Sequence, residues 1–265
     1  MEMEKAFVKT DLSKDGIATI TFFHPQSNSL PGEILRELAK QIEDAGNNPD
    51  AKVIVLQSIG DKAFCAGASF DELLIIAETA LTDMEAARQK GKVFFSGFAL
   101  VINAIRKAPK FVLGRVHSKA VGGGVGIASA VDYCFATTNA SVKLSELAVG
   151  IGPFVVGPAV QRKVGLSAFS QMSINATEWY SAEWARAKGL FYEVYENTEE
   201  MDKAIQKLAQ QLAKSNPDAV RQLKKVFWEG TEHWDDLLIQ RSGISGELVL
   251  SEYTRNFILS FKKKV

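Results

Sequence analysis

The stretch Ala120-Val-Gly-Gly-Gly-Val-Gly-Ile-Ala128 decides the fold. It follows an apolar, β-branched run at 110–116 that predicts a strand, and it opens a predicted helix. A second run of small residues, Ala66-Gly67-Ala68, comes soon after a predicted strand at 53–57 and also leads into a helix. Both runs place unpaired backbone N–H groups at a strand-to-helix transition, and two such donors converging on one point would form an oxyanion hole. A tight turn explains either run alone, but the two runs in this order are a more specific signal of an oxyanion hole.

The residues around these runs predict an α/β core. Apolar runs at 17–23 and 132–136 predict two more strands, and apolar residues at helical spacing predict a helix at 31–45. Strands separated by helices imply βαβ units and a largely parallel sheet. Residues 71–96 predict one amphipathic helical segment, which either borders a substrate cleft or lies on the surface.

The last third of the chain has a different pattern. Only helices are predicted there, at 199–214, 217–229 and 233–262. This change divides the chain into an α/β core at 1–197 and a helical segment at 198–265.

The composition argues against several classes of protein. The chain has 265 residues, and its 31 Lys and Arg balance 31 Asp and Glu, which argues against a nucleic-acid-binding surface. Its two cysteines, Cys65 and Cys134, are those expected of a reduced cytoplasmic protein. The acidic N-terminus has no apolar signal region, and no run is apolar enough to span a membrane. We therefore expect a cytoplasmic protein with neither nucleic acid nor membrane as a partner.

Common cofactor and metal motifs are absent from the sequence. It has no P-loop, no GxGxxG in its first βαβ unit, no GxSxG and no HExxH. His24, His117 and His233 are scattered and offer no metal-ligand spacing. We expect neither a metal nor a redox cofactor, and we expect each histidine to be structural or exposed.

Further motifs extend over nearly the whole chain. They are His24-Pro25, Asn28-Ser29-Leu30, Phe64-Cys-Ala-Gly-Ala68, Val116-His-Ser-Lys-Ala-Val-Gly-Gly-Gly124, Asp132, Ser145-Glu146, Gly150-Ile151, Ala187-Lys-Gly-Leu190 and Phe261. With the two glycine runs in this spacing, the chain resembles the crotonase superfamily, also called the enoyl-CoA hydratase/isomerase family. The resemblance implies an α/β spiral of ββα units with a C-terminal helical trimerisation segment, assembled as a trimer or a dimer of trimers. It also implies an acyl-CoA thioester substrate, so that coenzyme A is part of the substrate and no separate cofactor is needed.

The resemblance also assigns roles to individual residues. The two oxyanion-hole donors fall on the backbone N–H groups of Ala68 and Gly123. Chemistry beside a thioester carbonyl builds enolate charge on its oxygen, and each preplaced donor is typically worth roughly 3–4 kcal/mol in rate terms. The carbonyl of Ala66 falls where the family binds the adenine amino group.

Binding of the CoA phosphates requires lysines close to the site and does not require a positive net charge over the whole chain. Lys62 lies next to the loop of Ala68, and Phe261 is followed by three lysines that end at Lys264. We expect these residues to contact CoA. The residues of the tail would contact CoA bound to their own subunit or to a neighbouring one. A solvated charged tail is the alternative for the lysines after Phe261.

One position departs from the pattern of the family's hydratases, which hold a water between two glutamates. The first glutamate position is Gly126 here, whereas Glu146 matches the second. Losing the first weakens hydration most, while moving a double bond from C3 to C2 needs only one acid/base group. Glu146 is the predicted catalytic group; its alternative role is to cap a helix near Ser145. Asp71 or Glu72 could replace the missing carboxylate, or could lie on a solvated helix face.

The sequence leaves other activities open. A crotonase-type decarboxylase or hydrolase of an acyl-CoA uses the same oxyanion hole with fewer carboxylates. A non-catalytic CoA-ester-binding subunit is the alternative outside enzymes, and Gly126 makes it less remote. The pocket wall is expected from residues 71–96 and 152–156, although an ordinary turn also explains the second range.

Overall fold

The computed structural model describes residues 5–262, with side chains through Ser260. Its larger sheet has six strands in the order β1-β2-β4-β7-β9-β12. These strands are β1 (Phe7–Leu12), β2 (Ile17–Phe23), β4 (Val53–Ser58), β7 (Val112–Val116), β9 (Tyr133–Thr137) and β12 (Glu193–Tyr195). β1 pairs antiparallel with β2, and all the other pairings are parallel, which confirms the largely parallel sheet.

A smaller sheet runs beside the first, in the order β11-β10-β8-β5. Its strands are β5 (Ala63–Cys65), β8 (Lys119–Val121), β10 (Ser141–Lys143) and β11 (Tyr180–Ser181), and a separate pair is formed by β3 (Ser29–Leu30) and β6 (Gly67–Ala68). Consecutive strands such as β2 and β3, or β7 and β8, belong to different sheets, and a helix follows each of these two pairs. The chain therefore winds as the expected spiral of ββα units.

Helices close the turns of this spiral. They are α1 (Gly32–Asn47), α2 (Phe70–Thr79), α3 (Met84–Lys107), α4 (Gly123–Ala130), α5 (Gly157–Ile174) and α6 (Ala182–Ala187), with a 3₁₀ turn η1 (Leu147–Val149). The single helical segment expected at 71–96 is wrong, because α2 ends at Thr79 and a new helix, α3, begins after Asp83. The Asp83 side chain accepts a hydrogen bond from the Ala86 N–H at 2.9 Å and so caps α3.

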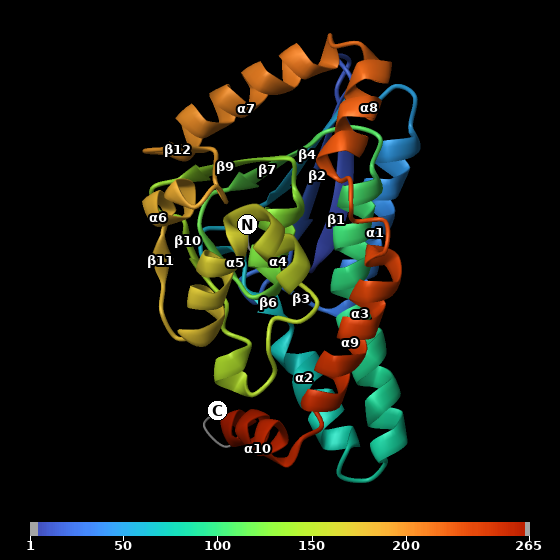
Figure 1. Cartoon of the computed structure of the whole chain (residues 1–265), viewed down its shortest axis with the longest axis vertical. Coiled ribbons are helices and arrows are strands. Elements are labelled where there is room, and N and C mark those ends of the chain that lie inside the picture. The colour runs from blue at the N-terminus through green and yellow to red at the C-terminus, as the bar shows by residue number, and fades with distance from the viewer. Residues whose placement is uncertain (1–4, 263–265) are drawn as a thin grey trace.

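The last third is helical as expected: α7 (Thr198–Ala213), α8 (Pro217–Phe227), α9 (Trp234–Leu248) and α10 (Glu252–Lys262). The single helix expected at 233–262 is also wrong, because Ser251 accepts from the Thr254 N–H at 3.3 Å and starts α10 as a new helix. Figure 1 shows α7 across the larger sheet, α9 along α3, and α10 at the opposite end beside α2; contacts between these elements agree.

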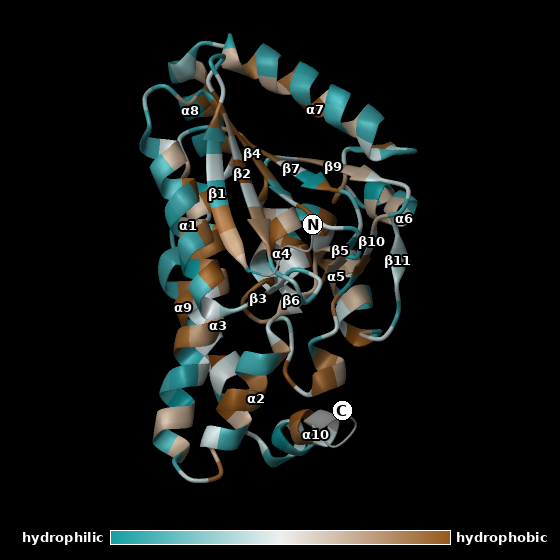
Figure 2. Cartoon of the chain, turned by 180° about the vertical axis from the view of Figure 1, so that it is seen from behind, coloured by the Kyte–Doolittle hydropathy of each residue, from teal (hydrophilic) through white to brown (hydrophobic). Residues whose placement is uncertain are grey.

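The main hydrophobic core lies between the larger sheet and the helices that pack on it. Buried aromatic side chains such as Phe22, Phe64 and Phe94 fill it. A second cluster on the other face of the sheet joins β4, β7 and β9 to the inner face of α7. Figure 2 shows hydrophilic residues over most of α7, which leaves only its inner stripe to pack. Between residues 5 and 262, no helix is long and apolar enough to cross a membrane.

Candidate active site

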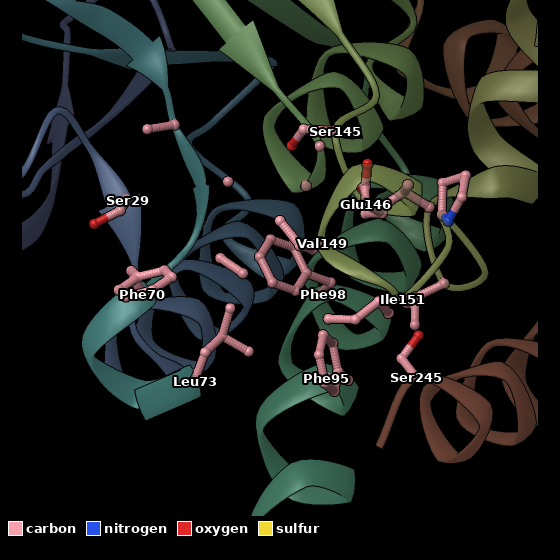
Figure 3. Close-up of a pocket in the computed structure, with 18 of the residues that line it drawn as sticks. Ser29, Phe70, Leu73, Phe95, Phe98, Ser145, Glu146, Val149, Ile151 and Ser245 are labelled. Carbon is pink, nitrogen blue, oxygen red and sulfur yellow. The ribbon is translucent and has the colours of Figure 1, made fainter. Parts of the chain in front are cut away.

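A cavity of about 470 Å³ opens where the two glycine runs meet the segment that follows β10. Its lining residues come from parts of the chain far apart in sequence: Gln26, Ser27, Ser29, Ala66, Gly67, Ala68, Phe70, Asp71, Leu73, Phe95, Phe98, Gly122, Gly123, Ser145, Glu146, Val149, Ile151–Val156 and Ser245. Figure 3 shows Ser145 and Glu146 on one side of this cavity and Leu73 and Phe95 on the opposite side. The cavity thus joins a polar side to an apolar one.

Ala68 ends the short strand β6, which pairs with β3. Ser69 N donates to Leu30 O at 3.2 Å across the β3–β6 pair. Ala68 lines the cavity, so its backbone N–H is the first candidate donor there.

Gly123 supplies a second backbone donor from the start of α4. The first N–H groups of a helix have no partner within the helix. The preceding Gly122 adopts φ +51° and ψ −114°, which L side chains avoid, and its N–H donates to Lys143 O at 2.8 Å. A Cβ atom added at Gly67 would lie 3.4 Å from Gly123 N, so the two glycine runs are in close contact. The structure therefore brings Ala68 and Gly123 to one cavity.

Glu146 faces the same turn from the other side. A Cβ atom added at Gly122 would lie 2.9 Å from Glu146 Oε1, so the carboxylate packs against this glycine. The residue as a whole is half-buried, but its Oε2 is sealed from solvent and has no hydrogen-bond partner among the described residues. Burial raises the pKa of Glu146 to about 7. A carboxyl group with such a pKa can both accept and return a proton near neutral pH.

The position without the first glutamate is filled by a neighbour. A Cβ atom added at Gly126 would lie 2.5 Å from Val156 Cγ1 and 2.6 Å from Val156 Cβ. Val156 is buried and directly precedes α5. A side chain at residue 126 therefore has no room while Val156 keeps its place.

The two candidate replacements for that carboxylate have other partners. Glu72 Oε1 accepts from the Gly32 N–H at 2.8 Å at the start of α1, and Glu72 does not line the cavity. Asp71 does line it, but its Oδ2 accepts from Gln26 Nε2 at 2.7 Å in an exposed contact. Glu146 is thus the only carboxylate among the described lining residues that is buried against the glycine turn.

The residues predicted to contact CoA are separated. Ala66 lines the main cavity, whereas the exposed Lys62 lines a neighbouring groove of about 620 Å³ that shares Ser27 with it. Phe261 lies in α10 with its side chain outside the described residues, and Lys264 lies wholly outside them. Within the described part of the chain, no group of His, Cys, Asp and Glu could hold a metal ion.

Sequence reasoning missed two residues that shape the site. Phe98 of α3 lies so close to Gly123 that a Cβ atom added there would be 2.1 Å from Phe98 Cε1. The buried Asn28, at φ +56°, donates through Nδ2 to Ile59 O and Ala63 O, both at 2.8 Å, and so ties the β3 turn to β5. The Asn28-Ser29-Leu30 motif was a signal for the second residue, but its role required the loop geometry.

An α/β spiral that brings two backbone N–H groups and one buried carboxylate to a single cavity has a fold and a site typical of an enzyme. The family model described as "Enoyl-CoA hydratase/isomerase" matches residues 13–245, and the chain belongs to this family.

Relatives of known description agree with this assignment. The chain is 27% identical over 257 residues to the short-chain-enoyl-CoA hydratase of Clostridium acetobutylicum, covering 96% of this chain and 94% of the relative. It is 26% identical over 211 residues to a peroxisomal Delta(3,5)-Delta(2,4)-dienoyl-CoA isomerase of Arabidopsis thaliana, covering 77% and 74%. The crystal structure of an enoyl-CoA hydratase from Bacillus halodurans matches the fold with a TM-score of 0.85 at 21% identity, covering 96% and 99%. The chain is therefore an enzyme of the lyase or isomerase type.

Proposed function

We propose that this chain moves the double bond of an enoyl-CoA thioester, with Glu146 as its single acid/base group. The backbone N–H groups of Ala68 and Gly123 hold the enolate oxygen. One observation carries the choice of isomerisation over hydration: Val156 occupies the space beside Gly126 from which a second carboxylate would extend. Loss of that second carboxylate weakens hydration most, whereas isomerisation needs only one acid/base group.

In the proposed reaction Glu146 moves one proton from C2 to C4 of the substrate. Glu146 removes a proton from C2 of a 3-enoyl-CoA, and the electron pair of the broken C–H bond forms a C1–C2 double bond while the carbonyl π pair moves to oxygen. The two backbone donors stabilise this enolate oxygen. The carbonyl then re-forms, C2 and C3 become doubly bonded, and the former C3–C4 π pair takes the proton from Glu146 at C4. The product is the conjugated 2-enoyl-CoA, and the carboxylate is regenerated.

The two neighbouring cavities fit the two ends of such a substrate. Leu73, Phe95 and Phe98 give the main cavity an apolar side for an acyl chain. The groove lined by Lys62 adjoins the main cavity at Ser27, and this cation supports our assignment of the CoA phosphates to the groove. We assign the adenine contact to Ala66, and contacts from Phe261 and Lys264 stay predictions.

The test is to offer the purified protein 3-enoyl-CoA and 2-enoyl-CoA esters of the same chain length. The proposal predicts that absorbance of the conjugated enone rises with the first substrate and is nearly constant with the second. Rapid loss of the enone from the 2-enoyl ester would instead identify a hydratase. No change with either ester, together with measurable binding of CoA esters, would favour the decarboxylase, hydrolase or non-catalytic alternatives.

We also propose that the chain assembles as a trimer or a dimer of trimers. Exposed apolar side chains on the helical elements support this: Leu166 and Ile174 of α5 are 62% and 77% exposed, and Val226 of α8 is 62% exposed. Exposed apolar side chains that gather into one patch are typical of surfaces that a partner covers. Light scattering on a sizing column measures the mass; a mass of about 29 kDa, that of one chain, would contradict the assembly.

A further inference from the structure

The C-terminal helix α10 is bonded to the segment that carries Glu146. Thr254 Oγ1 donates to Gly150 O at 3.0 Å, although the two residues lie 104 positions apart. The next N–H in the chain, that of Ile151, donates to Glu146 O at 3.0 Å. One peptide group, between Gly150 and Ile151, therefore accepts from α10 on one side and holds the backbone of Glu146 on the other.

The contact between Thr254 and Gly150 is close and shielded from solvent. Thr254 is fully buried, and a Cβ atom added at Gly150 would lie 2.4 Å from Thr254 Oγ1. Gly150 has φ +87°, a left-handed conformation that favours glycine. Both its conformation and this close approach require glycine at residue 150.

The Thr254 hydroxyl is itself oriented by Ser251. Ser251 Oγ donates to Thr254 Oγ1 at 3.0 Å and accepts from the Thr254 N–H at 3.3 Å. A hydroxyl that accepts one hydrogen bond and donates another is fixed in direction, and such chains strengthen each member. The hydrogen of Thr254 is therefore directed at Gly150 O.

We propose that Thr254 is a positioning residue for the acid/base group, acting through the Gly150–Ile151 peptide on Glu146. The proposal rests on the proposed function, since it assumes that Glu146 carries the proton. The turn η1, which directly follows Glu146, has no buried residue of its own. α10 also contacts α2, which follows the donor Ala68 by two residues, so the same helix braces both sides of the site.

The experiment compares Thr254→Val with Thr254→Ser in the full chain. Valine keeps the shape of threonine but cannot donate to Gly150 O, whereas serine keeps the donor. We expect kcat for 3-enoyl-CoA to fall about tenfold in the valine variant with KM nearly unchanged, less than the 10²-fold that a 1 Å misplacement can cause. Serine is expected to restore most of kcat. Equal kcat values in Thr254→Val and the wild type would overturn the proposal.

A matched control separates positioning from general stability. Thr231 is also buried, and its Oγ1 donates to Trp228 O at 2.6 Å outside the cavity. Thr231→Val should lower the melting temperature as Thr254→Val does, yet leave kcat unchanged; an equal fall of kcat in both variants would contradict a positioning role. Should Thr254→Val fail to fold, Ser251→Ala replaces it: a smaller loss of kcat supports the proposal, and no loss overturns it.

The two proposals fail in different ways. If Glu146→Gln keeps wild-type turnover, the proposed function is wrong. If Glu146→Gln is inactive while Thr254→Val and Ser251→Ala both keep full kcat, only the role of Thr254 is wrong.

Discussion

At the scale of single residues, the pKa of Glu146 makes a testable link between burial and rate. Its carboxyl group acts as a base only when deprotonated, and burial raises its pKa to about 7 from the ordinary value of 4.5. We therefore expect kcat/KM for 3-enoyl-CoA to rise with pH and level off above about pH 7. A pH–rate profile of the wild type measures this. A profile flat from pH 5 to 8 would contradict the buried base.

The glycine at residue 126 gives a second prediction at this scale. Gly126→Ala places a methyl group against Val156 Cγ1, and overpacking of this kind typically costs about 1–3 kcal/mol. Val156→Ala in the same chain should recover part of that loss, which denaturant unfolding of the single and double variants measures. A Gly126→Ala variant as stable as the wild type would mean that Val156 does not fill the space.

The same residues show how far sequence reasoning reaches. The absence of a carboxylate at residue 126 was visible in the sequence, because the glycine run fixes the alignment of that position. The packing of Val156 against Gly126 was not visible in the sequence. Val156 lies 30 residues further on and meets Gly126 only where α4 packs against α5. The roles predicted for Ala68, Gly123 and Glu146 converge on one cavity, and their catalytic parts stay predictions.

At the scale of elements, the turn into α4 holds one of the two donors. Gly123→Ala places a methyl group 2.1 Å from Cε1 of the buried Phe98, so either the Phe98 ring or the first turn of α4, with its N–H groups, must shift. Removing one oxyanion donor typically costs 10²–10³-fold in kcat, and we expect a loss of roughly 10- to 100-fold from its displacement. Steady-state rates with 3-enoyl-CoA measure it.

Gly243→Ala in α9 is the matched control for this change. No atom lies within 4 Å of a Cβ atom added at Gly243, so the variant should keep wild-type kcat. Unchanged kcat in Gly123→Ala as well would contradict a role for the start of α4.

Helix boundaries were the part of the fold that the sequence predicted least well. The periodicity of apolar residues runs through both 71–96 and 233–262, so it predicts one helix in each range. Asp83 and Ser251 interrupt them as capping residues, a signal that was present but weaker than the periodicity. The four strands that the sequence predicts, at 17–23, 53–57, 110–116 and 132–136, agree with β2, β4, β7 and β9 to within two residues, since buried parallel strands are short apolar runs between turn residues. The other strands of the structure were not predicted, because most of them are only two or three residues long.

At the scale of the whole molecule, a buried ion pair fastens the C-terminal helices to the core. Lys224 Nζ of α8 lies 2.5 Å from Asp132 Oδ2, and both side chains are at most 5% exposed. Asp132 also accepts from the Val112 N–H at 2.8 Å and from Trp228 Nε1 at 3.2 Å. This carboxylate thus joins the larger sheet to α8 and the residue that follows it.

Lys224→Met should therefore destabilise the fold strongly. The variant leaves the Asp132 charge buried without its cation, a loss that typically costs about 3–5 kcal/mol. Lys225→Met, at the exposed neighbour on the same helix, should change the free energy of unfolding by less than about 0.5 kcal/mol. Urea unfolding of both variants measures the difference, and equal stabilities would show that the ion pair does not fasten α8.

In the proposed reaction a single glutamate carries the proton, so the decisive measurement is the turnover of Glu146→Gln with 3-enoyl-CoA. Glutamine keeps the size of the side chain but cannot take the C2 proton, so we expect a loss of at least about 100-fold in kcat. Because a raised pKa lowers native stability as pH rises from 4.5 toward 7, the variant should also melt higher than the wild type at pH 8, by roughly 2–4 °C per kcal/mol gained. A folded Glu146→Gln protein that forms the conjugated enone at the wild-type rate would show that Glu146 is not the acid/base group.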